Sequence, residues 1–80
     1  MTEAEARTVI NRANHRDNAW EVGRAYYAEF TTAGARDRYT EAAVTLGGEV
    51  LGTGSYSLGQ YEDLRKGQRA TVFFATVVLR

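Results

Sequence analysis

The stretch that most constrains the fold is Thr71 to Leu79, which reads Thr-Val-Phe-Phe-Ala-Thr-Val-Val-Leu. Seven of its nine residues are apolar, and both sets of alternating positions carry apolar side chains. A short, continuous run of β-branched and aromatic residues is typical of a strand that is covered on both faces. The sequence therefore predicts a buried strand from about Arg69 to Leu79, which the rest of the chain must enclose.

The chain has 80 residues, ten basic and ten acidic side chains, and no cysteine. This length fits a single domain, residues 1–80. Zero net charge argues against a general nucleic-acid binder, because such proteins usually carry a basic excess. The lack of cysteine excludes disulfides and thiolate metal sites. No apolar run is long enough to span a membrane. The acidic stretch Met1–Glu5 lacks the layout of a secretion signal. We therefore expect a cytoplasmic protein.

A helix is predicted from Thr2 to Asn14. Thr2 suits the N-cap position, and Glu5, three residues later, completes a capping box. Apolar residues then recur with helical spacing at positions 6, 9, 10 and 13. This apolar stripe is narrow, so the helix needs a sheet to pack against.

The middle of the chain predicts further strands. Trp20 to Thr32 alternates apolar and polar residues, which indicates a strand with one apolar face. The stretch from Arg38 to Leu46 fits either a strand or a helix, with Gly47 as the stop signal of the helix. We favour the strand, because Gly47-Gly48 also suits a hairpin turn into a strand from Glu49 to Leu58. One short helical turn is expected at residues 61–65.

These elements predict an α+β fold. The N-terminal helix packs on a curved antiparallel sheet of about four strands, in the order α-β-β-β-β, with a helix as the alternative for the second strand. The first three strands form a meander, and the fourth follows a longer connection.

No motif carries a recognisable chemistry. His15, the only histidine, is interpreted as a solvated loop residue, because a metal site needs more ligands and a catalytic base needs a nucleophile. The glycines between positions 47 and 54 match neither a dinucleotide fingerprint nor a Walker A loop, so we interpret them as turn and sheet-twist residues. No carboxylate pair has the apolar surroundings that would raise a pKa. We therefore expect no catalysis, no cofactor and no metal.

Tyrosine and arginine are the residue types that point to binding. Aromatic side chains beside arginines on a sheet can stack single-stranded bases, and the same two types are enriched at the centres of protein interfaces. The alternative interpretation is that half of the tyrosines belong to the core. The candidate binding residues are Arg24, Tyr26, Tyr27, Arg36, Arg38 and Tyr39.

We expect a small, non-catalytic protein-binding module. Small cysteine-free proteins without motifs are common among phage and mobile-element products that inhibit a larger host complex, anti-CRISPR proteins among them, and the comparison is one of size only. The alternatives are a nucleic-acid-binding module that uses a Tyr/Arg sheet face and a structural accessory subunit.

A homodimer is expected from the last strand. One helix with four small or medium apolar residues can cover one face of a sheet, but not both. The second face must then meet other strands of a curling sheet or another subunit, because an exposed apolar strand favours aggregation. Two-fold dimers are the commonest assembly of this kind. We expect Phe73 or Phe74, together with Val77, at or near the dimer interface.

Overall fold

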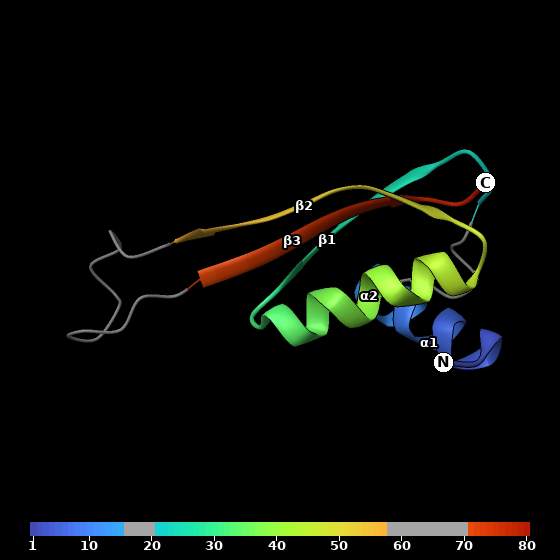
Figure 1. Cartoon of the computed structure of the whole chain (residues 1–80), viewed down its shortest axis with the longest axis horizontal. Coiled ribbons are helices and arrows are strands. Elements are labelled where there is room, and N and C mark those ends of the chain that lie inside the picture. The colour runs from blue at the N-terminus through green and yellow to red at the C-terminus, as the bar shows by residue number, and fades with distance from the viewer. Residues whose placement is uncertain (16–20, 58–70) are drawn as a thin grey trace.

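The computed structural model describes residues 1–15, 21–57 and 71–80. Its elements are α1 (Glu3–Ala13), β1 (Ala25–Phe30), α2 (Ala33–Thr45), β2 (Glu49–Ser57) and β3 (Thr71–Val78). Both helices lie on the same side of the sheet, so the described part of the chain forms two layers (Figure 1). The predicted α+β class is confirmed, but with two helices and three strands among the described residues in place of one helix and about four strands.

The C-terminal strand β3 is the central strand of the sheet. The strand order is β1-β3-β2, and both pairings are antiparallel. Tyr26 of β1 and Val50 of β2 both lie opposite Val77, and the register of β2 shifts between Val50 and Gly52. The predicted meander was therefore wrong. A strand as apolar as β3 belongs between two neighbours, because there both of its edges are hydrogen-bonded and shielded from water.

The predicted N-terminal helix is confirmed as α1. The Thr2 hydroxyl accepts a hydrogen bond from the Glu5 backbone N–H at 3.1 Å and lies 3.1 Å from the Glu5 carboxylate, to which it donates. Ala6 and Ile10 are fully buried. The apolar stripe read from the sequence is thus the face that packs in the core.

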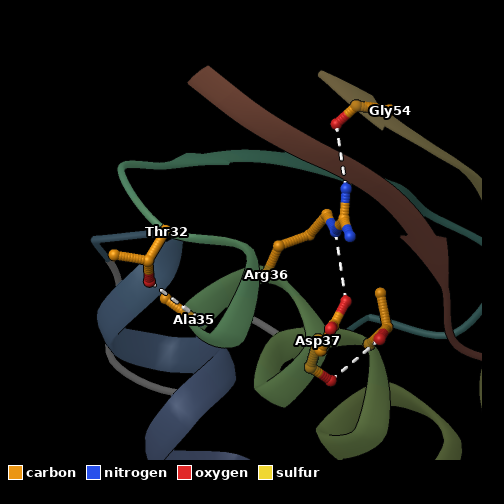
Figure 2. A network of polar contacts seen from close by, with 6 residues as sticks. Thr32, Ala35, Arg36, Asp37 and Gly54 are labelled. Carbon is orange, nitrogen blue, oxygen red and sulfur yellow. Dashed lines mark hydrogen bonds and ion pairs between the residues drawn. The ribbon is translucent and has the colours of Figure 1, made fainter. Parts of the chain in front are cut away.

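The strand favoured from Arg38 to Leu46 was wrong, because residues 38–45 belong to α2 and Leu46 is its C-cap. Thr32 caps this helix, since its hydroxyl accepts a hydrogen bond from the Ala35 N–H at 3.1 Å (Figure 2). Tyr39, Ala42 and Ala43 are fully buried on the face that α2 turns toward the core. Their spacing is that of the helical alternative, which groups 39, 42, 43 and 46 on one side.

The glycine pair that favoured a hairpin turn in fact ends α2. Gly47 has a φ of +82°, a conformation that glycine adopts without the strain of a Cβ atom. The Gly48 N–H donates to the Ala43 carbonyl at 2.8 Å, and the Gly47 N–H donates to the Val44 carbonyl at 3.0 Å. This pair of bonds is a Schellman motif. Its second glycine leads directly into β2.

The core lies between the helix layer and one face of the sheet. Its largest fully buried side chains are Ile10, Tyr39 and Val77. On the other face of β3, Phe74 and Thr76 are only half-buried. No described element covers this second face (Figure 1), so β3 is enclosed by a second layer on one face only.

The predicted strand from Trp20 to Thr32 was too long, because β1 begins at Ala25 and ends at Phe30, and Thr32 already caps α2. The predicted strand ends at Trp20, Leu58 and Arg69 and the short turn at 61–65 lie outside the described residues. Neither of the two described helices is long and apolar enough to cross a membrane.

Candidate functional site

The uncovered face of the sheet carries a cluster of aromatic side chains around one carboxylate. Side chains alternate between the two faces along a strand, and this alternation places Tyr27 and Glu29 of β1, Tyr56 of β2 and Phe74 of β3 on the same face. We call these four residues the aromatic face. Tyr27 and Tyr56 expose 53% and 42% of their surface, so both side chains are partly accessible to solvent.

Phe74 is the centre of the aromatic face. Its ring centroid lies 6.0 Å from that of Tyr27 and 6.3 Å from that of Tyr56, both in tilted arrangements. Such spacings are favourable for aromatic pairs. The ring lies over Gly54, where an added Cβ atom would come within 2.9 Å of the Phe74 Cε2 atom and nearer still to Cζ. The glycine therefore leaves the space that the ring occupies.

Glu29 joins the two tyrosines. The Tyr27 hydroxyl donates a hydrogen bond to Glu29 Oε2 at 3.1 Å, and the Tyr56 hydroxyl donates to the same oxygen. The pKa of the Tyr27 phenol is raised by desolvation, by its hydrogen bond to Glu29 and by the negative charge of that carboxylate. The other oxygen, Oε1, accepts no hydrogen bond from the described residues. The aromatic face thus presents an available carboxylate oxygen among three rings.

The structure separates the predicted arginines from this cluster. Arg24 forms an ion pair with Glu21 at 3.7 Å. Arg36, on α2, forms an ion pair with Asp37 at 3.2 Å and donates to the Gly54 carbonyl at 3.3 Å (Figure 2). Its guanidinium also lies 5.4 Å from the ring centroid of Phe73, within the range of a cation–π contact. Arg36 therefore links the helix layer to β2 on the covered side of the sheet.

Two of the predicted binding tyrosines belong to the core. Tyr26 and Tyr39 expose 5% and 0% of their surface. The Tyr26 hydroxyl accepts a hydrogen bond from the Glu21 N–H at 2.9 Å, and the Tyr39 hydroxyl donates to Asn14 Oδ1 at 3.0 Å. Burial raises the pKa of Tyr39 to about 12, against the lowering effect of the Asn14 hydrogen bond. This pair matches the alternative interpretation that part of the tyrosines belong to the core.

Of the six predicted binding residues, only Tyr27 lies on the aromatic face, and Arg38 lines a cleft described below. Glu29 and Tyr56 were not among the predicted binding residues. The alternation of β1 could have identified Glu29, because residues 27 and 29 share a face of any strand. Tyr56 lies in a strand without a clear apolar pattern, so no comparable signal marks it.

The three residues expected at a dimer interface lie in three different environments. Val77 is fully buried in the core, so its side chain is not available to a partner. Phe73 is half-buried beneath the Arg36 guanidinium on the covered side. Phe74 alone lies on the uncovered face. The dimer itself stays a prediction.

His15 is exposed at the end of α1, with a φ of 54°. No group of three His, Cys, Asp or Glu side chains within residues 1–15, 21–57 and 71–80 is arranged to hold a metal ion. The chain matches no protein-family model, no curated protein sequence and no solved structure at a significant level. Its geometry is therefore the basis for a functional proposal.

Proposed function

We propose that this chain is a non-catalytic protein-binding module whose aromatic face binds an Arg or Lys side chain of another protein. The observation that carries the proposal is the position of Glu29. Its Oε2 atom is held by two tyrosine hydroxyls, and its Oε1 atom has no hydrogen-bond donor in the described part of the chain. A cationic side chain of a partner supplies that donor.

The rings around Glu29 favour the same kind of partner. The faces of aromatic rings attract cations, and the cation in such contacts is more often Arg than Lys. Tyrosine also supplies a large contact area while losing little conformational entropy, which is why it is frequent at the centres of interfaces. The hydroxyls of Tyr27 and Tyr56 hold the carboxylate in place, so a partner need not order it on binding. Prior ordering of this kind increases affinity.

Charge argues against the two other occupants. A nucleic acid would bring phosphates toward Glu29, while Arg24 and Arg36 are paired with carboxylates away from the aromatic face. A second copy stacked on the same face would bring two Glu29 carboxylates together. Like charges in close contact are unfavourable. A partner with a basic surface meets neither obstacle, and inhibition of a larger host complex is one role such a module could have.

The test compares two matched carboxylate variants. Glu29→Gln removes the charge from the aromatic face, and Glu41→Gln removes an exposed charge from α2. Each tagged chain is used to capture proteins from its native host, and the captured proteins are identified by mass spectrometry. We expect at least one protein that wild type and Glu41→Gln retain and Glu29→Gln loses. In direct titration, Glu29→Gln should weaken that complex about 10-fold or more, as expected for a charge-assisted hydrogen bond.

Three results would contradict the proposal. The first is that Glu29→Gln and Glu41→Gln capture the same proteins with equal affinity. The second is salt-sensitive binding of short single-stranded DNA or RNA in fluorescence anisotropy, which would support the nucleic-acid alternative. The third is a dimer mass in sedimentation at micromolar concentration that Phe74→Ser converts to a monomer, which would make a second copy the occupant of the aromatic face.

A further inference from the structure

A separate cleft lies where the end of α1, the end of β1 and the first turn of α2 meet. It is open to solvent and has a volume of about 390 Å³. Small-molecule sites commonly measure roughly 300–1,000 Å³. The apolar part of its lining consists of half-buried side chains from all three elements: Val9, Ala13, Phe30 and Ala35.

The polar part of the lining is mostly basic. It comprises Arg12 and His15 at the end of α1, and Arg38 in α2. Glu29 also borders the cleft, but the tyrosine hydroxyls of the aromatic face bind its Oε2 atom. In addition, the first turn of α2 contains no acidic residue. Among the described residues, the cleft is therefore lined by two arginines and one histidine against a single carboxylate, Glu29.

The two arginines of the cleft differ from all the other described arginines. Four of the six described arginines form ion pairs with a carboxylate: Arg7, Arg24, Arg36 and Arg80. The guanidinium groups of Arg12 and Arg38 form no ion pair and no hydrogen bond with any residue in the described ranges. These two residues are far apart in the sequence, yet they line the same cleft. The chain has equal numbers of acidic and basic residues, so this pair is a local excess of positive charge.

We infer that this cleft binds a small anion with an apolar body, that is, an aryl or alkyl phosphate or carboxylate. The planar guanidinium groups match the geometry of such oxyanions and form strong, charge-assisted hydrogen bonds with them. The apolar lining takes the ring or alkyl chain, and a bound anion supplies the negative charge with which neither guanidinium is paired in the described part of the chain. The inference does not rest on the proposed protein-binding function: the two sites share Glu29 at their border, but the two arginines line the cleft and the three rings lie on the opposite side of the sheet.

Phenyl phosphate is a suitable probe. It is titrated into the full ¹⁵N-labelled chain at constant ionic strength, with benzyl alcohol as the neutral control, and binding is followed by NMR. We expect saturable shifts of the amide signals of Val9, Ala13 and Ala35, with a dissociation constant of about 1 mM or tighter. Benzyl alcohol should bind at least about 10-fold more weakly, because it lacks the anionic group.

Charge-matched variants separate a built site from general attraction. Arg12→Gln and Arg38→Gln should each weaken phenyl phosphate binding about 10-fold, the usual effect of losing a charged hydrogen bond. Arg7→Gln removes the same charge from the same helix outside the cleft, and should leave binding within about twofold of wild type. The spectra themselves show whether each variant is folded.

The inference is overturned if phenyl phosphate gives no saturable shifts, if Arg7→Gln weakens binding as much as the two cleft variants, or if benzyl alcohol binds equally well. A Glu29→Gln variant that loses its protein partner but still binds phenyl phosphate would show that the two sites are distinct.

Discussion

Gly54→Ala tests the arrangement on which the aromatic face depends. Gly54 has an ordinary backbone conformation, since the glycines with positive φ among the described residues are Gly23 and Gly47. The added methyl group would therefore act through contact and not through backbone strain. It would come within 2.9 Å of the Phe74 Cε2 atom and nearer still to Cζ, whereas carbon atoms in contact normally lie about 3.5–4.0 Å apart.

The ring must consequently move by about 1 Å or swing away from the sheet. Overpacking of this kind typically destabilises a protein by about 1–3 kcal/mol. The displacement would also disturb the favourable contacts of Phe74 with Tyr27 and Tyr56, each worth about 0.5–1.5 kcal/mol beyond burial. We expect the free energy of unfolding to fall by about 1–3 kcal/mol, with loss of partner binding at the aromatic face.

Gly52→Ala is the matched control, because it lies in the same strand and an added Cβ atom there meets nothing within 4 Å. It should leave the free energy of unfolding unchanged or raise it by about 0.4–1 kcal/mol, because alanine gives the unfolded chain less conformational freedom than glycine does. Urea denaturation of both variants, followed by circular dichroism, should give a midpoint about 1–2 M lower for Gly54→Ala than for Gly52→Ala. Equal midpoints, with unchanged ring signals of Phe74 in NMR spectra, would show that the ring does not lie over Gly54.

Three further predictions concern the core. Ile10→Ala should lower the free energy of unfolding by about 2–4 kcal/mol in urea denaturation, because Ile10 is fully buried. Asn14→Ala should cost about 1–3 kcal/mol, because it leaves the buried Tyr39 hydroxyl without its acceptor; adding Tyr39→Phe should recover part of that loss. The pKa of Tyr39 is about 10 in the unfolded chain and is raised to about 12 in the folded protein. The contribution of Tyr39 to the free energy of unfolding is therefore complete below about pH 9 and falls by about 2–3 kcal/mol toward pH 12. Measuring the free energy of unfolding of wild type and Tyr39→Phe between pH 9 and pH 12 checks this last effect. The same pH dependence in both proteins would contradict it.

Local sequence signals predicted the elements whose ends are chemically marked. The capping box of Thr2 and Glu5 fixed the start of α1, and the apolar run after Thr71 identified β3. The α2 helix was missed because Gly47-Gly48 satisfies two motifs equally well, a Schellman ending and a hairpin turn. Only the burial of Tyr39 in the core that α1, α2 and the sheet form together decides between them, and that core is a property of the whole fold.

The candidate site was harder to predict than the fold. Tyr26 and Tyr27 are adjacent, and a strand sends one to each face. Which of them is buried depends on where the helices lie, and that depends on α2. The order of the strands is likewise not encoded locally, so the sequence did not show that Tyr27, Tyr56 and Phe74 would meet.

The central position of β3 has a consequence for how the chain folds. β1 and β2 form no ladder with each other; both pair with β3, which is synthesised after them. Until β3 emerges, α1 and α2 can meet, but each outer strand has two unpaired edges. Sheet formation therefore depends on contacts between distant parts of the sequence, which slow folding. A nascent chain that stalls before β3 should be prone to aggregation, so conditions that favour rapid completion of β3 should improve the yield of folded protein.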